Sequence, residues 1–154
     1  MKKVAIYPGS FNPLHEGHID VIEKTLRVFD KVIVARGINP DKEFNLKQDN
    51  ERFAEYVSSV LFDNLPHHKH HIISKVTGFV FQGLFKDFID LIKQPNVIIK
   101  GLRNGRDLEY EKDQQYWNED LGIEIPTFYI IADRKLAHIS SSAIKSIEKF
   151  KEQI

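Results

Sequence analysis

The stretch YPGSFNPLHEGH, from Tyr7 to His18, is the first part of the sequence whose residue types and spacing could do chemistry. It combines two glycines, two prolines and two histidines. Gly9 would let the backbone approach a ligand closely, and a helix beginning at about Gly17 would offer unpaired amides and a dipole that favour an anion. His18 falls in the first turn of that helix and is expected to face the same crevice. The stretch therefore predicts a phosphate-binding loop, although a rigid capped turn would use the same residues.

Metal binding is the weaker alternative for the histidines of this sequence. Near His15 and His18, no carboxylate or third histidine lies at a fixed short spacing. His15 is therefore expected to be a variable loop position. A second cluster, HHKHH at residues 67–71, is expected to be a solvated surface patch at the start of a strand, because all-histidine sites without helical spacing are rare.

Three further segments that follow apolar runs carry groups suited to phosphate. Lys42 lies in a long polar connection, Lys100 and Arg103 flank Gly101, and three serines start the last helix: Ser140, Ser141 and Ser142. Each segment alone is ordinary, because serines cap helices and charged loops are usually solvated. Together they predict a crevice ringed by cations, hydroxyls and amides. Such groups stabilise phosphoryl transfer electrostatically, without a protein nucleophile.

The elements that would position these groups alternate along the chain. Runs rich in β-branched residues predict strands at 3–8, 31–38, 70–75, 96–100 and 126–132. Segments of helical period predict helices at 17–29, 51–62, 78–92, 107–121 and 140–150. The polar segment 39–50 is expected to be a long, functional or mobile connection.

Five strand–helix units in succession predict the α/β class, as a Rossmann-like, doubly wound, five-stranded parallel sheet with right-handed crossovers. The length of 154 residues predicts one domain, spanning 1–154. Ligands in such sheets bind beyond the carboxyl ends of the strands, near the switch in strand order. The polar groups described above all lie at those ends.

Composition narrows the class of protein. The 22 basic and 22 acidic side chains cancel, which argues against a nucleic-acid coat, and the absence of cysteine excludes disulfides and thiolate catalysis. The apolar run at the N-terminus is too short for a signal peptide, and no later run approaches a membrane span. These features predict a soluble, cytoplasmic protein with no nucleic-acid or membrane partner.

The loop GSFNPLHEGH resembles the T/HxGH signature of the nucleotidyltransferase superfamily. With KGLRNGRDLEYE and HISSS added, the chain from Lys3 to about Lys145 resembles the phosphopantetheine adenylyltransferases. The specific part of the resemblance is the pair of motifs formed by Gly101, Leu102, Arg103 and by Asp107, Tyr110, Glu111. The resemblance implies transfer of AMP from ATP to 4'-phosphopantetheine, giving dephospho-coenzyme A and pyrophosphate, with magnesium and in a homo-oligomer.

The resemblance also implies a role for each matching residue. His18, Lys42 and Arg103 would be catalytic, with His18 steadying the phosphate in the transition state. The ATP site would comprise Ser10, Phe11, His18, Gly101, Leu102, Arg103, Glu111, Leu136, His138, Ile139, Ser140, Ser141 and Ser142. The acceptor would meet Ser10, Lys42, Phe85 and Lys100, and Leu84 would line its arm or lie in a helix core. No side chain is expected to ligate Mg²⁺, which ATP oxygens and water would hold.

Several positions leave other functions open. Asn12, Lys100 and Leu136 to His138 depart from the family pattern, and GSFNP is closer to nicotinate mononucleotide adenylyltransferases. The alternatives are therefore a nicotinate or nicotinamide mononucleotide adenylyltransferase, or another enzyme with a small phosphate acceptor. RNA binding is disfavoured by the neutral charge. A non-catalytic nucleotide-binding module would be expected to lack His18, Lys42 or Arg103, and all three are present.

Overall fold

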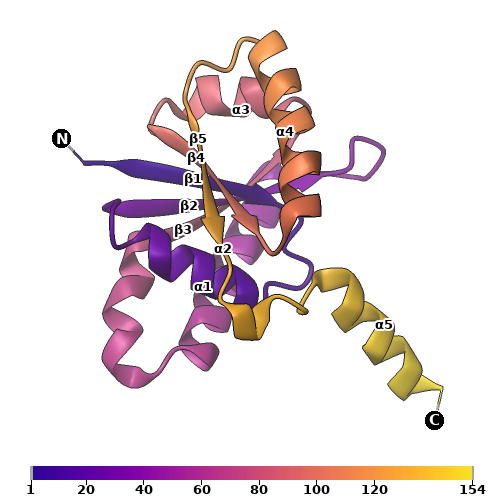
Figure 1. Ribbon diagram of the computed structural model, residues 1–154. Coiled ribbons are helices and arrows are strands. Elements are labelled where there is room, and N and C mark those ends of the chain that lie inside the picture. Colours follow the sequence, from indigo (N-terminus) through magenta and orange to yellow (C-terminus); the bar gives the residue numbers. More distant parts are fainter. Residues whose placement is uncertain (1, 154) are drawn as a thin grey trace.

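A five-stranded sheet runs through the centre of the computed structural model, which describes residues 2–153 (Figure 1). Every neighbouring pair of strands is parallel, and their order across the sheet is β3-β2-β1-β4-β5. The strands are β1 (Val4–Gly9), β2 (Lys31–Ile38), β3 (Val76–Gln82), β4 (Val97–Leu102) and β5 (Thr127–Ile131). The predicted α/β class with a doubly wound parallel sheet is confirmed. Met1 and Ile154, the ends of the predicted domain, lie outside the described residues.

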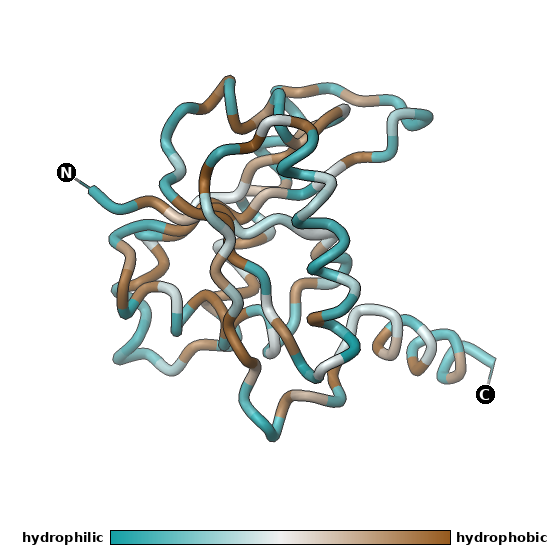
Figure 2. The backbone as a smooth tube through the Cα atoms, turned by 45° about the horizontal axis from the view of Figure 1, so that its top comes forward, coloured by the Kyte–Doolittle hydropathy of each residue, from teal (hydrophilic) through white to brown (hydrophobic). Residues whose placement is uncertain are grey.

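Helices cover both faces of this sheet. They are α1 (Glu16–Thr25), α2 (Leu46–Asn64), α3 (Phe85–Ile92), α4 (Gly105–Asp120) and α5 (Ser141–Glu152). Successive strand residues point to opposite faces, so β1 sends Ala5 towards α1 and α2 and sends Ile6 towards α3. Both side chains are fully buried. The strands are accordingly apolar on both faces, and the tube in Figure 2 is mostly brown or pale along them.

The third strand–helix unit differs from the prediction. Residues 70–75, expected as a strand, belong to a 3-10 helix (His67–Lys75), and β3 follows it. The expected helix 78–92 is correspondingly a strand, a turn at Gly83 with φ 98°, and the shorter α3. The prediction failed because residues 78–92 are apolar almost throughout, and such a run fits a buried strand as well as a helix.

Two other segments differ in extent or packing. Helix α2 begins at Leu46 because Asn45 accepts a hydrogen bond from the Gln48 N–H, so the polar connection after β2 is shorter than the predicted 39–50. Helix α5 extends away from the body of the molecule (Figure 1), and Ile147 and Phe150 on its predicted apolar face are exposed. None of the helices within residues 2–153 has the length and apolarity needed to cross a membrane.

Candidate active site

A cavity of about 310 Å³ opens at the carboxyl ends of β1 and β4. The crossovers from β1 to β2 and from β3 to β4 run in opposite directions across the sheet, so this is the switch point in strand order. The lining residues are Tyr7, His15, Gly17, His18, Val21, Gly101, Arg103, Asp107, Tyr110, Glu111, Ala132, Leu136, Ile139, Ser140 and Ser141. The cavity therefore lies where the topology predicts a ligand.

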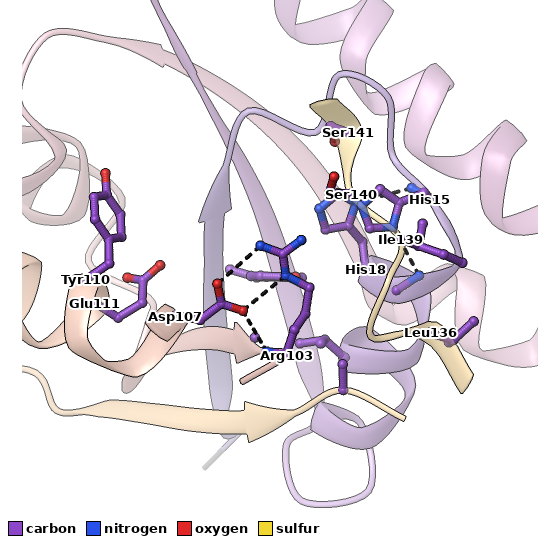
Figure 3. A pocket seen from close by; sticks show the side chains of 15 residues that line it. His15, His18, Arg103, Asp107, Tyr110, Glu111, Leu136, Ile139, Ser140 and Ser141 are labelled. Atoms are coloured by element: carbon purple, nitrogen blue, oxygen red, sulfur yellow. Dashed lines mark hydrogen bonds and ion pairs between the residues drawn. The ribbon is translucent and has the colours of Figure 1, made fainter. Parts of the chain in front are cut away.

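Two histidines form the N-terminal cap of α1 on one side of the cavity (Figure 3). Nδ1 of His15 accepts a hydrogen bond from the Gly17 N–H, and Nδ1 of His18 accepts one from the His15 N–H, both at 3.1 Å. The two rings stack with their centroids 3.7 Å apart. His15, predicted to be a variable loop position, does lie in the loop before α1, and its side chain has a role that was not predicted: it caps the helix and lines the cavity.

The His18 ring is held in one protonation state. Because Nδ1 accepts a hydrogen bond, the proton of the neutral ring lies on Nε2, which is left as a donor. Burial, with smaller contributions from His15 and Arg103, lowers the pKa of His18 to about 3. Burial and Arg103 also lower the pKa of His15. His18 is thus a neutral N–H donor at the end of a helix whose dipole favours anions.

We expect the stability of the protein to fall with acidification in a way that His18→Gln reduces. The pKa of His18 is lower in the folded protein than in the unfolded chain, so stability is full above about pH 6.5 and is lost as the pH falls towards 3. Glutamine three residues after a helix cap preserves the capping box but does not titrate. Urea unfolding at about pH 7.5 and pH 5 should show a loss smaller by about 2 kcal/mol in the variant. Equal losses would contradict the buried neutral state.

Arg103 faces Asp107 in the middle of the cavity (Figure 3). Nε and Nη2 of Arg103 donate to the two carboxylate oxygens at 3.0 and 3.1 Å, and the Arg103 N–H donates to Oδ2 at 2.7 Å. These bonds raise the pKa of Arg103 and lower that of Asp107. The guanidinium is therefore charged and oriented, and Nη1 together with the second N–H of Nη2, which Asp107 does not use, can donate to phosphate oxygens.

A second ion pair lies beside the first. Nζ of Lys100 is 3.2 Å from Oε2 of Glu111, which is buried and receives no hydrogen bond from the described residues. The hydroxyl of Tyr7 lines the same floor, and burial, with help from Glu111 and Asp20, raises the pKa of Tyr7. Each pair thus joins a cation at the end of β4 to a carboxylate on α4. The two carboxylates, Asp107 and Glu111, lie one helical turn apart.

The segment between β5 and α5 forms the last wall of the cavity. Asp20 on α1 accepts a hydrogen bond from the Asp133 N–H at 2.9 Å, and the Ser141 hydroxyl donates to the Pro13 carbonyl at 2.9 Å. Ser140 caps α5 by accepting from the Ala143 N–H. The wall is therefore tied at both ends to α1 and to the loop that precedes it.

We expect Gly101→Ala to destabilise the protein through its contact with α1. A Cβ at this position would lie 2.9 Å from Cγ2 of Val21 and 3.3 Å from the Tyr7 hydroxyl. Overpacking of this kind costs about 1–3 kcal/mol, measurable by urea unfolding. Adding Val21→Ala should recover part of the loss. In Gly105→Ala, the control, the new Cβ meets nothing within 4 Å, so stability should not fall. A Gly101→Ala protein as stable as this control would contradict the close packing.

The structure brings half of the predicted site residues to the cavity. These are His18, Gly101, Arg103, Glu111, Leu136, Ile139, Ser140 and Ser141. The predicted residues that do not line it are Ser10, Phe11, Lys42, Phe85, Lys100, Leu102, His138 and Ser142. The side chains of Phe11 and Leu102 are buried, so only their backbones could meet a ligand. Leu84 is exposed, so its alternative assignment to a helix core was wrong.

Lys42 lies on the exposed connection between β2 and α2. Nε2 of Gln82 at the end of β3 donates to the carbonyl oxygens of Asn39 and Lys42 at 3.0 Å each. Lys42 thus stands at the same edge of the sheet as the cavity but outside its lining. Phe85 is half-buried at the start of α3, where it packs against Phe81.

Sequence reasoning missed several lining residues. Asp107 was named only as part of the family motif, although its spacing predicts a role, because a carboxylate four residues after Arg103 at a helix start is a standard ion-pair arrangement. Tyr7, near the carboxyl end of β1, lines the cavity, but within the stretch from Tyr7 to His18 it was given no role of its own. Tyr110 carried no signal apart from the family motif.

The histidine cluster at residues 67–71 lies away from the cavity, on the 3-10 helix before β3. Nε2 of His70 is 2.9 Å from the Leu65 carbonyl, and the His70 ring packs on Phe62 with centroids 4.6 Å apart. Throughout residues 2–153, no three histidine or acidic side chains are grouped so that they could hold a metal ion.

Comparison with known proteins identifies the family of the chain. The Cytidylyltransferase-like family model matches residues 6–147, which is nearly the whole chain. The chain belongs to the cytidylyltransferase-like family. Proteins named phosphopantetheine adenylyltransferase from Clostridium beijerinckii and Clostridium novyi are 38% and 39% identical to it over 148 residues. These alignments cover 96% of this chain and 86% and 84% of the two relatives.

The fold agrees with this family membership. The crystal structure of a candidate nicotinate-nucleotide adenylyltransferase from Vibrio parahaemolyticus superposes with a TM-score of 0.59 at 18% identity. The match covers 95% of this chain and 80% of that one. The protein is therefore a cytidylyltransferase-like nucleotidyltransferase, with its cavity at the switch point of the sheet.

Proposed function

We propose that the protein transfers AMP from ATP to 4'-phosphopantetheine, giving dephospho-coenzyme A and pyrophosphate. The observation that carries the proposal is that the N–H donor of His18 and the fork of Arg103 share one cavity at the N-terminus of α1. An imidazole donor, a guanidinium and a helix end are the groups that stabilise charge on a phosphate under attack. The Clostridium relatives support phosphopantetheine as the acceptor.

The reaction requires positioning and charge stabilisation. The acceptor phosphate oxygen attacks the α-phosphorus of ATP, the bond to the β-phosphate oxygen breaks, and pyrophosphate leaves. As charge builds on the oxygens of the α-phosphate, His18 Nε2–H would donate to one of them, and Arg103 would bind phosphate through the guanidinium N–H groups that Asp107 leaves free. Neither residue takes a proton in this step, which suits the low pKa of His18.

The remaining site residues are assigned on the same proposal. The backbones of Ser10, Phe11, Gly101 and Leu102 would contact ATP, and Glu111 would hold it from α4. Leu136, His138, Ile139, Ser140, Ser141 and Ser142 would form the outer wall of the nucleotide site. Ser10, Lys42, Phe85 and Lys100 would meet the acceptor, with Lys42 reaching it from the exposed loop beside the cavity.

Magnesium fits this site as an ion that arrives with the nucleotide. Asp107 is paired with Arg103, and Glu111 is paired with Lys100, so both lining carboxylates are already engaged. Magnesium commonly keeps several waters and binds substrate phosphates rather than a protein cage. Bound in that way, it would neutralise part of the phosphate charge.

We also propose a cytoplasmic homo-oligomer. Exposed large apolar side chains on two elements support assembly, namely Tyr110, Tyr116 and Trp117 on α4 and Ile147 and Phe150 on α5.

The decisive experiment follows pyrophosphate release from ATP and magnesium with 4'-phosphopantetheine, nicotinate mononucleotide or nicotinamide mononucleotide as acceptor. We expect release with phosphopantetheine and the appearance of dephospho-coenzyme A. Release with a mononucleotide but not with phosphopantetheine would contradict the proposed acceptor and still support an adenylyltransferase. Binding of ATP without release in any arm would favour the non-catalytic module.

A further inference from the structure

The loop between β1 and α1 accepts hydrogen bonds from a side chain of the neighbouring strand β2. Arg36, near the end of β2, donates from Nε to the Ser10 carbonyl at 2.8 Å and from Nη2 to the Phe11 carbonyl at 2.5 Å. These two carbonyls belong to consecutive residues, so one planar guanidinium fixes the orientation of two successive peptide groups.

Two aromatic residues of α2 complete this arrangement. The guanidinium carbon of Arg36 lies 4.2 Å from the centroid of the Phe53 ring and 5.4 Å from that of Tyr56. The Tyr56 hydroxyl accepts a hydrogen bond from the Leu14 N–H at 2.9 Å. We call Arg36, Phe53 and Tyr56 the loop clamp, because Arg36 and Tyr56 bind the loop backbone near its two ends and Phe53 packs against the Arg36 guanidinium.

Arg36 differs in its partners from the two cations at the end of β4. Arg103 and Lys100 pair with carboxylates, whereas no carboxylate of the described residues forms an ion pair with Arg36. Arg36 is half-buried, and burial lowers its pKa. Burying part of a cation costs free energy, and here the hydrogen bonds to two carbonyl groups offset that cost. Arg36 therefore fixes the position of this backbone.

The clamped backbone also adopts a conformation that needs support. Phe11 has φ 46°, in the left-handed region that bulky side chains rarely adopt. Its carbonyl is the one that accepts from Nη2 of Arg36, and its ring is 1% exposed. The clamp therefore holds a strained peptide at a position where the side chain is buried.

This backbone supports His18 from two directions. The Phe11 ring packs edge-on against His18 with centroids 4.9 Å apart. Leu14, held by Tyr56, precedes His15, whose N–H donates to Nδ1 of His18. Movement of the loop would therefore shift both the ring beneath His18 and the hydrogen bond that sets its tautomer.

We propose that Arg36 and Tyr56 are positioning residues of the transfer reaction, which hold the loop so that Nε2–H of His18 points at the reacting phosphate. The inference rests on the proposed function for its kinetic consequence. The holding of the loop is independent of any substrate.

The test compares Arg36→Met, Arg36→Lys and Tyr56→Phe with the wild-type protein. Arg36→Met keeps an apolar stem against the rings and loses both donors, whereas Arg36→Lys keeps the charge and loses the fork. Tyr56→Phe keeps the ring and loses the bond to Leu14. Arg52→Met on the exposed side of α2 is the matched control.

We expect kcat to fall about 10- to 100-fold in Arg36→Met, because a small misplacement of a catalytic group costs up to about 100-fold. The KM for ATP should change less than kcat does, since the contact with His18 strengthens in the transition state, whereas the proposed contacts of the Ser10 and Phe11 backbones with ATP already form in the ground state. Arg36→Lys should not restore kcat, and Tyr56→Phe should show a smaller fall. Amide hydrogen exchange of residues 10–15 should quicken in all three variants and stay unchanged in Arg52→Met.

Restoration of kcat by Arg36→Lys would overturn the proposal, because charge alone would then suffice. So would unchanged exchange in residues 10–15 of folded Arg36→Met and Tyr56→Phe. The exchange measurement needs no acceptor, so it decides whether the clamp holds the loop even if the wild-type protein adenylates none of the acceptors. A wild-type protein that adenylates none of the acceptors would overturn the proposed function and leave the role of the clamp in holding the loop unaffected.

Discussion

His18→Ala is expected to lower kcat by about 100- to 1,000-fold, the usual cost of removing one preorganised donor to a developing oxyanion. The KM for ATP should change little, because the hydrogen bond from Nε2 strengthens only as charge builds on the phosphate. Steady-state release of pyrophosphate over a range of ATP concentrations measures both quantities.

His18→Gln separates the two tasks of this side chain. Glutamine can still accept the His15 N–H and preserve the capping box, but it replaces the rigid ring, which packs edge-on against Phe11, with a flexible amide that does not fix the direction of its N–H. We therefore expect it to keep the stability of α1 and to lose most of the turnover. A kcat within about threefold of wild type in both variants would remove His18 from the transition-state role.

Arg103→Met is expected to lower kcat/KM for ATP by about 10- to 100-fold, because hydrogen bonds to a charged group are worth about 1.5–3 kcal/mol. Arg103→Lys should recover only part of this loss, since an ammonium is a point charge and cannot reproduce the fork. The same pyrophosphate assay, with ATP varied at saturating acceptor, gives the value for each variant.

Arg106→Met is the matched control, because Arg106 is exposed on the first turn of α4 and does not line the cavity. Asp107→Asn keeps the shape of the partner and removes its charge, so Arg103 would remain but lose its fixed orientation. We expect an intermediate loss there. Equal activity of Arg103→Met and Arg106→Met would exclude a phosphate contact by Arg103.

The fold and half of the site could be predicted because they depend on local patterns. Alternating apolar runs and helical segments define a parallel sheet, and the rule that ligands bind at strand ends picked out His18, Arg103 and Ser140. The third strand–helix unit was misplaced because the apolar residues between Gly78 and Ile92 fit a buried strand as well as a helix.

The rest depends on how distant segments meet. His15 caps α1 only because the loop backbone turns its ring onto Gly17, and no spacing rule encodes that rotation. Arg36 lies 25 residues from Phe11 in sequence and reaches its carbonyl only through the pairing of β1 with β2. The counter-ions of Lys100 and Arg103 required the position of α4 over the end of β4.

The two ion pairs at the end of β4 give the site a means of sorting ligands by valence. Arg103 and Lys100 each have a carboxylate partner within the protein. A small anion such as inorganic phosphate would compete with a carboxylate for either cation and would reach only a few of the remaining donors at once. A triphosphate offers many oxygens at once and can engage the guanidinium, the imidazole and the helix end together. We therefore expect small anions to bind the site more weakly than a polyanion does.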